Sequence, residues 1–263
     1  MKIFRHVILL FPVLLLYTFG WTQNLLTRKK YTIDSREKSI PLPNRSIYVE
    51  RGVVGSLAFG VFLAKGNWYK DSFLLQWQGE GSYFYTKNIS GGLSAKIIAG
   101  EPDSAAQVEN RYVGFIRIHK CFSNLGLYAG PFAGIYNLEF STDDPQRNDI
   151  QLTLLDYGLE SGIGWKFIPL VGGTLGIQAE QVLYPKSLFD VILRERDKIN
   201  ISESLFRVLI GINLDLREIW PQLKTICKGA YLSVEWQYSF ISDLDFPIRK
   251  NDNVFMIGSS TAF

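Results

Sequence analysis

The sequence predicts an all-β protein, an antiparallel β-barrel that spans a membrane. Three observations predict it: several segments alternate apolar and polar residues, the N-terminus reads as an export signal, and the last segment alternates up to an aromatic terminal residue, Phe263. Apolar residues make up 47% of the chain and aromatic residues 14%. Each strand of such a barrel shows one face to lipid and one to the lumen, so apolar residues are expected in alternation and not in blocks.

The N-terminus has the features of a secretory signal peptide over residues 1–22. Lys2, Arg5 and His6 form a basic start, and residues 7–19 are almost entirely apolar. A run of this length is too short to cross a bilayer as a helix, although a retained membrane anchor is the alternative. Removal of residues 1–22 leaves 26 basic and 25 acidic side chains. This balance points to no nucleic-acid partner.

A polar stretch without a period follows the signal peptide. It covers residues 23–45 and is interrupted by Pro41 and Pro43. We predict a short periplasmic N-terminal arm over residues 23–45 and the barrel over residues 46–263.

Ten segments are candidates for membrane strands. Alternation is clearest in residues 72–85, 155–167, 206–216 and 231–240. Weaker candidates are residues 47–63, 91–100, 109–121, 127–140, 173–184 and 253–263. Ten is an even number, as expected for a single-chain bacterial barrel.

The connections between these segments predict the orientation of the barrel. Periplasmic turns are short and outer loops are longer in this class of protein. Short connections are expected at residues 86–90, 122–126 and 168–172, and longer outer loops at 101–108, 141–149, 185–203 and 242–252. Two connections depart from the rule. The first outer loop, near residues 64–68, is short, and the inner connection 217–228 is long and is expected to begin a short periplasmic helix.

The polar faces of the segments carry charges of both signs beside glycines. We predict a network of these side chains in a narrow lumen, because small residues next to opposite charges leave room for ion pairs across it. Aromatic residues at segment ends are typical of the girdles at both membrane surfaces. A soluble barrel with its apolar face inward is the alternative. The predicted lumen residues are Glu80, Lys96, Arg117, Asp156, Glu160, Lys166, Glu180, Arg207, Asp215 and Glu235.

The C-terminal segment resembles the terminal strand of bacterial outer-membrane barrels. Phe255, Ile257 and Phe263 share one face of this segment, and Gly258 lies between them. The resemblance implies that these residues form the signal read by the barrel-insertion machinery. It also implies location in the cell outer membrane of a Gram-negative bacterium, with membrane lipid and lipopolysaccharide as neighbours.

Two cysteines, Cys121 and Cys227, are both expected at the periplasmic end. An exported protein can form disulfides, and the spacing of these residues fits no zinc site. A disulfide between them and two free thiols are equally compatible with the sequence.

Glycine–aromatic motifs resemble those of PorT-type small outer-membrane β-barrel proteins of the Bacteroidota. They are Gly-Leu-Tyr-Ala-Gly-Pro-Phe-Ala-Gly over residues 126–134 and Leu-Asp-Tyr-Gly-Leu-Glu-Ser-Gly-Ile-Gly over residues 155–164, followed by a strand at 175–183. The resemblance implies an outer-membrane barrel without established chemistry. The chain departs from the family pattern at Glu180 and Gln181, where the family usually has an Arg-Tyr pair. The family tends to eight strands, so eight is the alternative to ten.

The sequence offers little catalytic chemistry. His119 is the one histidine beyond the signal peptide, and it is expected at the periplasmic end, away from outer-leaflet lipid and external peptides. The acidic pairs Asp143-Asp144 and Asp243/Asp245 fall in expected outer loops, where they suit calcium or, more simply, solvated charge. We therefore expect no cofactor, no resident metal and no catalytic residue.

The function expected from these features is that of a non-enzymatic integral barrel. It would act in envelope structure, in surface binding or as the membrane component of an assembly with protein partners. A lumen this narrow is filled largely by side chains, which argues against a wide porin. A narrow pore for small solutes is the first alternative, and an outer-membrane hydrolase is the second.

Overall fold

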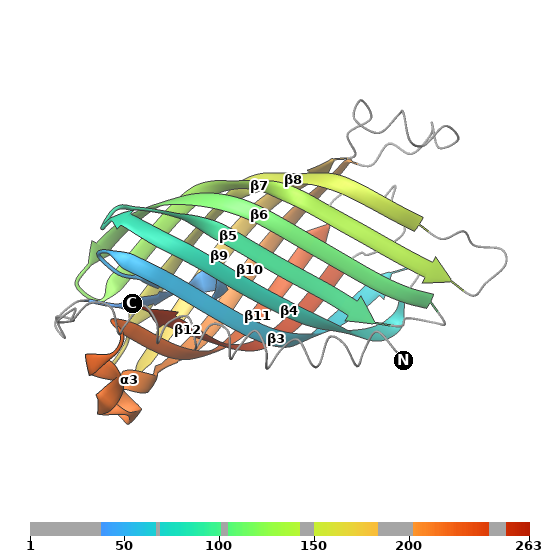
Figure 1. Ribbon diagram of the computed structural model, residues 1–263. Helices are drawn as coiled ribbons and strands as arrows, with labels where there is room; N and C mark the ends of the chain where they lie inside the picture. The colour runs from blue at the N-terminus through green and yellow to red at the C-terminus, as the bar shows by residue number, and fades with distance from the viewer. Residues whose placement is uncertain (1–37, 67–68, 101–104, 143–149, 184–201, 242–250) are drawn as a thin grey trace. The chain divides into compact units, whose positions relative to one another are not determined.

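The structure, a computed structural model, describes residues 38–66, 69–100, 105–142, 150–183, 202–241 and 251–263. Ten antiparallel strands form a closed barrel, in which each strand pairs with its neighbours in sequence and the last strand pairs with the first (Figure 1). The strands are β3 (Gly52–Gly66), β4 (Tyr69–Thr86), β5 (Ile89–Gly100), β6 (Ala105–Phe122), β7 (Leu125–Thr142), β8 (Ile150–Lys166), β9 (Val171–Leu183), β10 (Ser202–Asp215), β11 (Gly229–Ile241) and β12 (Asn251–Ala262).

The predicted ten-strand antiparallel barrel is confirmed, and the alternative of eight strands is wrong. Five of the ten predicted segments lie within the observed strands, and four others run one residue past the end of their strand. The segment predicted at 47–63 differs more, because β3 begins only at Gly52. At the seam, the backbone N–H groups of Val53 and Phe263 each donate to the other residue's carbonyl, at 3.1 and 2.8 Å.

Side chains alternate between a lipid-facing surface and a polar interior. In β8, Leu155 and Leu159 are 47% and 64% exposed, whereas the residues that follow each of them, Asp156 and Glu160, are buried. In β11, Leu232 and Val234 face outward, and the intervening polar residues face inward. A soluble barrel would have the opposite arrangement. The apolar face is therefore the one available to lipid.

Aromatic side chains cluster at both ends of the lipid-facing surface. Tyr83 and Tyr85 pack edge to face with ring centroids 5.0 Å apart, and Trp165 and Phe167 do so at 5.3 Å. At the other end of the barrel, Tyr238 stacks on Trp236 and packs edge to face with Phe240. Amphipathic rings at these two levels form the girdles expected at the membrane–water boundaries.

One end of the barrel carries short, described connections, such as the two-residue turns after β4 and β6. This is the periplasmic end by the rule that periplasmic turns are short. The long connection after β10 contains α3 (Leu216–Ile219) and the 3-10 helix η2 (Pro221–Thr225), as predicted. Among the described residues, no helix has the length and apolar character needed to cross a membrane.

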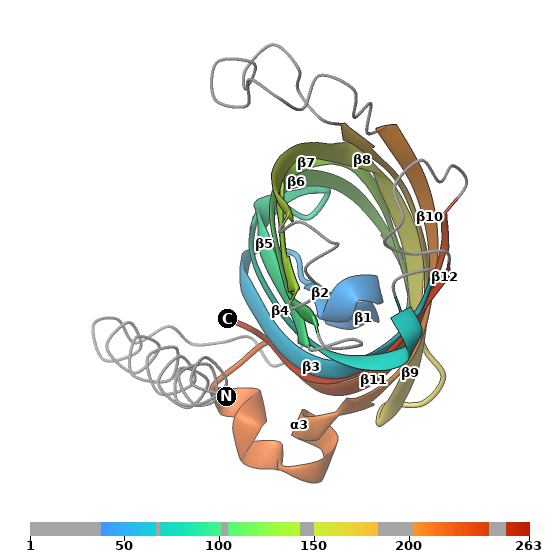
Figure 2. The same ribbon diagram turned by 90° about the vertical axis from the view of Figure 1, so that its right-hand side faces the viewer.

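A hairpin from the N-terminal region lies inside the ring of strands (Figure 2). It consists of β1 (Ile40–Leu42), a single 3-10 turn η1 (Pro43–Arg45) and β2 (Ser46–Tyr48), and we call it the lumen hairpin. Its residues are all buried. The arm was expected to end at residue 45, a boundary that falls inside this hairpin. The remainder of the expected arm and the expected signal peptide lie outside the described residues.

The sequence of the hairpin explains its shape. Asn44 and Arg45 have φ values of 58° and 59°, the left-handed conformation that reverses the chain. Asparagine tolerates this conformation well, and Pro43 fixes the preceding φ. Glycines of the wall make room for the hairpin: a Cβ at Gly164 would collide with the backbone of Pro41 and Leu42, and one at Gly162 with the ring of Pro43.

The facing of the strands predicts which positions tolerate charge. Val208→Arg, at mid-depth on the lipid-facing surface, is expected to destabilise the barrel by about 2–4 kcal/mol, and Ile163→Arg, nearer the interface, by less. Gln78→Arg, on the lumen side, is expected to be tolerated. Refolding yield into phospholipid vesicles, followed by heat-dependent gel mobility, measures the effect. Equal tolerance at all three positions would contradict the facing described here.

Candidate functional site: the filled lumen

The lumen hairpin is anchored near the periplasmic end by an apolar cluster. Ile40, Leu42, Ile47, Tyr48 and Val49 pack with wall residues from several strands, and all of them are buried. The wall residues are Val54, Phe84, Tyr128, Tyr231 and Ala262. Inward-facing apolar residues such as Phe84 interrupt the polar face of their strands. The hairpin is what they pack against, so the lumen here is a protein core and not a water channel.

The tip of the hairpin makes polar contacts with three strands. Arg45 Nη1 lies 2.9 Å from Glu235 Oε1 on β11, and the backbone N–H of Asn44 donates to Glu235 Oε2 at 2.9 Å. Asn44 Nδ2 donates to Glu160 on β8 at 3.3 Å. Ser46 Oγ accepts from Arg117 on β6 at 3.4 Å. These contacts fix the tip at the level of the charged layer of the lumen.

Arg117 is the centre of that layer. Two of its nitrogens contact both carboxylate oxygens of Glu80 on β4, at 2.5 and 3.0 Å, and its Nε contacts Glu160 at 2.6 Å. Its guanidinium also lies over the ring of Phe115, 3.9 Å from the centroid. The side chain is 2% exposed. One buried cation therefore connects two acidic residues, an aromatic ring and the hairpin. Of the residues predicted for the lumen, the structure brings Glu80, Arg117 and Glu160 together here.

A second charged cluster lies farther toward the outer end. Arg111 contacts Asp156 and, at 2.9 Å, Glu180; Arg207 contacts Glu180 at 2.8 Å. Lys96, the register neighbour of Arg111 on β5, is also buried. The sequence reasoning named each of these residues except Arg111. The alternation of side chains along β6 could have identified Arg111 as a lumen residue, since Arg111 and Arg117 lie an even number of residues apart and so share a face.

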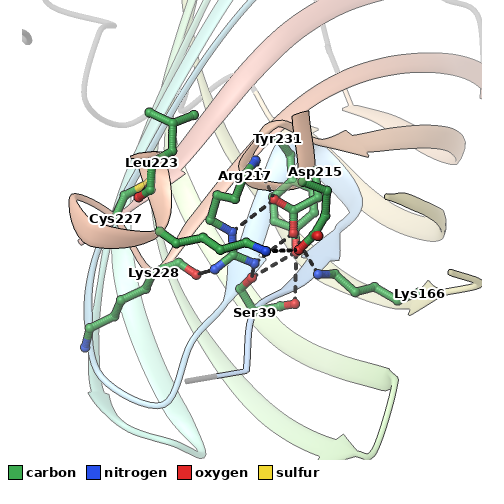
Figure 3. A network of polar contacts seen from close by, with 10 residues as sticks. Ser39, Lys166, Asp215, Arg217, Leu223, Cys227, Lys228 and Tyr231 are labelled. Carbon is green, nitrogen blue, oxygen red and sulfur yellow. Dashed lines mark hydrogen bonds and ion pairs between the residues drawn. The ribbon is translucent and has the colours of Figure 1, made fainter. Parts of the chain in front are cut away.

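A third cluster surrounds Asp215 at the periplasmic mouth (Figure 3). Lys166 Nζ lies 2.8 Å from Asp215, and Arg217 Nη2 lies 2.7 Å from it. Arg217 also donates to Ser39 Oγ at 2.5 Å, and Tyr231 donates to the Ser39 carbonyl at 2.9 Å. The cluster therefore ties the start of the hairpin to β8, β10 and β11. Burial alone would lower the pKa of Arg217, but its hydrogen bond and ion pair with Asp215 leave that pKa above its ordinary value.

The charges in the lumen balance only when the hairpin is included. Among the side chains that the structure describes, the lumen and its periplasmic mouth contain seven acidic and seven basic residues. The acids are Glu80, Glu109, Asp156, Glu160, Glu180, Asp215 and Glu235, and the bases are Arg45, Lys96, Arg111, Arg117, Lys166, Arg207 and Arg217. Arg45 comes from the hairpin, and it is the cation that contacts Glu235. Without the hairpin, Glu235 would lose this partner inside the barrel.

His119 occupies the apolar part of the lumen. Its Nε2 lies 2.7 Å from Ser90 Oγ, and its ring packs near Tyr48, Phe84 and Tyr128. Its Nδ1 has no hydrogen-bond partner among the described residues. A serine–histidine contact without a carboxylate behind the imidazole lacks the group that orients a catalytic base.

The described residues also contain no group of side chains suited to hold a metal ion. The acidic pairs at 143–144 and 243/245 lie outside the described residues.

Both cysteines carry free thiols. Cys227 is buried, and its Sγ donates to the carbonyl of Leu223 at 3.3 Å. Burial raises the pKa of the Cys227 thiol, so the thiol remains protonated at neutral pH.

Of the residues predicted to form the C-terminal insertion signal, Phe255 and Ile257 face lipid, while Gly258 faces the lumen beside Arg45. Their role in insertion stays a prediction.

A small cavity of about 220 Å³ opens at the periplasmic mouth. Four cationic residues line it: Lys38, Lys166, Arg217 and Lys224. Lys166 and Arg217 are paired with Asp215, and Lys224 with Glu218. These ion pairs offset most of the positive field. The cavity therefore gives the mouth a mildly basic rim.

The fold and the lumen define the class of protein. A closed barrel satisfies every strand ladder within itself, which is what permits strands to cross lipid. With its apolar outer surface, aromatic girdles and charged interior, the chain is a small integral β-barrel protein of the Gram-negative outer membrane.

Comparison with known proteins gives similarity in architecture. No protein-family model matches the chain, and no curated protein matches it. The translocator domain of the autotransporter NalP from Neisseria meningitidis is 10% identical, with a TM-score of 0.47 over 81% of this chain and 88% of that one. The β-domain of the Bordetella autotransporter BrkA is 10% identical, with a TM-score of 0.46 over 81% and 100%. Neisserial surface protein A is 9% identical, with a TM-score of 0.40 over 81% and 97%.

Proposed function

We propose that this protein is a non-enzymatic outer-membrane barrel with a closed lumen, acting as the membrane component of an envelope assembly. The observation that carries the proposal is the lumen hairpin. It is buried along its length, packed in an apolar cluster and joined to β6, β8 and β11 by polar contacts. A barrel filled in this way offers a stable membrane body. Its neighbours would be membrane lipid, lipopolysaccharide, the barrel-insertion machinery and envelope proteins.

Kinship with PorT-type barrels is part of the proposal. The motif segments at residues 126–134 and 155–164 lie on β7 and β8, which pair along their length. Gly126, Gly162 and Gly164 in these segments are the positions where a Cβ would press on the hairpin. These three motif glycines thus have a physical role in this chain: they make room for the lumen hairpin, whereas a Cβ at Gly130, Gly134 or Gly158 would meet neighbouring wall residues.

The alternatives are weaker on the same observations. A narrow pore would need the hairpin to leave, which would remove Arg45 from Glu235 and expose the apolar cluster to water. A hydrolase would need a nucleophile and base at an accessible surface, whereas His119 and Ser90 are buried among aromatic rings. The absence of enzymatic activity belongs to the proposal and calls for direct assay with phospholipid and peptide substrates.

Two measurements on the intact protein test the proposal. In planar lipid bilayers, the purified barrel is expected to give no steady conductance; well-defined openings of the wild-type protein would favour the pore instead. In mild detergent, a particle extracted from the native membrane is expected to exceed the 30.0 kDa chain plus its detergent and to contain defined companions. A lone barrel would contradict the assembly role and leave envelope structure or surface binding.

A further inference from the structure

The connection between β10 and β11 lies outside the barrel wall. Figure 1 places α3 at the periplasmic end of the barrel, and Figure 2 places it beside the wall and outside the ring of strands. The apolar residues Ile219, Trp220 and Ile226 of this connection are 47%, 55% and 43% exposed. A connection facing only water would not be expected to leave a tryptophan and two isoleucines uncovered together.

These residues continue the lipid-facing surface of the adjacent strands. Ile212 on β10 and Leu232 on β11 face lipid, and the connection begins and ends next to them. In the periplasmic turn between β8 and β9, Phe167 and Ile168 are also exposed. In register, Trp165 pairs with Gly173 and Gly173 with Ile212, and α3 begins four residues after Ile212. α3 therefore follows the part of β10 that is in register with the periplasmic aromatic girdle, next to which the headgroup region of the inner leaflet is expected.

The same connection carries two lysines. Lys224 and Lys228 accompany the single acid Glu218, which pairs with Lys224 at 2.9 Å, whereas Arg217 is buried and pairs with Asp215. Lys224 and Arg217 line the cavity at the mouth together with Lys38 and Lys166. A tryptophan and other exposed apolar residues combined with lysines in one short segment are typical of elements that lie in a membrane interface.

We propose that the segment 216–228 is an interfacial anchor that binds the inner leaflet of the outer membrane, with Trp220 and Ile219 inserted at the level of the headgroups and the lysines contacting anionic phospholipid. Lipid is the occupant because the apolar patch is continuous with the established lipid-facing surface and the two lysines match anionic headgroups. The inference depends on the barrel and its orientation, not on the assembly role proposed above.

Fluorescence quenching by brominated phospholipids tests the anchor. The full mature chain and its Trp220→Phe variant are refolded into phosphatidylcholine vesicles that carry bromine on the upper part of the acyl chains. The difference between the two spectra isolates the emission of Trp220. We expect this emission to be shifted to the blue relative to an indole in water and to lose most of its intensity. Emission at the position of hydrated indole, without quenching, would overturn the proposal.

Two controls make the result specific. Trp236→Phe isolates a lipid-facing residue on β11 and must show quenching, since it reports correct insertion. Replacing part of the phosphatidylcholine by phosphatidylglycerol is expected to increase the quenching of Trp220, and Lys224→Gln is expected to reduce that increase. If phosphatidylglycerol changed the quenching of Trp220 neither in the wild-type protein nor in the Lys224→Gln variant, the part of the proposal that assigns anionic phospholipid would be overturned.

Discussion

Replacing Arg117 by methionine is expected to lower the free energy of unfolding of the barrel by about 3–5 kcal/mol, the usual cost of removing one partner from a buried ion pair. Methionine fills a similar volume but leaves Glu80 and Glu160 as neighbouring buried carboxylates without their shared cation. It also removes the donor to Ser46 of the hairpin. Urea-induced unfolding in detergent micelles, followed by tryptophan fluorescence, measures the loss.

The matched control is the exposed ion pair between Lys224 and Glu218. Its side chains are 39% and 32% exposed, so Lys224→Met is expected to cost under about 1 kcal/mol. If Arg117→Met were as mild as this control, the charged layer of the lumen would contribute little, and the hairpin would be held mainly by its apolar cluster. A double variant that also carries Glu80→Gln is expected to recover part of the loss, because it removes one of the two unpaired charges.

The barrel could be predicted from the sequence because its determinants are local. Alternation along one strand, such as Leu155 to Phe167, already separates the lipid-facing side from the lumen side. The short turns and the long connection at 217–228 were likewise visible in the composition between segments. The start of the first barrel strand could not be predicted, since the weak segment at 47–63 joins the last two residues of β2 to β3.

The lumen hairpin could not be predicted, because it depends on the whole barrel. Its residues show no clear period, and its prolines read as a linker. The space it fills is made by Gly126, Gly162, Gly164 and Gly176, on three strands far along the chain. One indirect signal was present. The predicted lumen set held six acids and only four bases, and a buried excess of carboxylates requires further cations. The structure supplies them as Arg45, Arg111 and Arg217.

Introducing a side chain at Gly164 is expected to expel the hairpin and open the barrel. A Cβ at this position would meet the backbone of Pro41 and Leu42, which cannot move aside while the apolar cluster stays packed. Gly164→Val therefore overpacks the lumen, a change that costs about 1–3 kcal/mol in a filled core. The wall itself should accept valine, which favours strands. Release of the tip is feasible, because Arg45 Nε and Nη2 have no hydrogen-bond partner among the described residues and would gain water.

Two readouts distinguish expulsion from misfolding. The variant is expected to show discrete conductance in planar bilayers with a preference for cations, since loss of Arg45 leaves the carboxylate of Glu235 without its ion pair. Trypsin is expected to cleave after Arg45, which is 1% exposed in the filled barrel. Gly81→Val is the matched control: nothing lies within 4 Å of a Cβ there, so that barrel should stay closed and resistant. A closed, trypsin-resistant Gly164→Val barrel would mean that the hairpin tolerates displacement within the lumen, and the close approach at Gly164 would then not be what fixes its position.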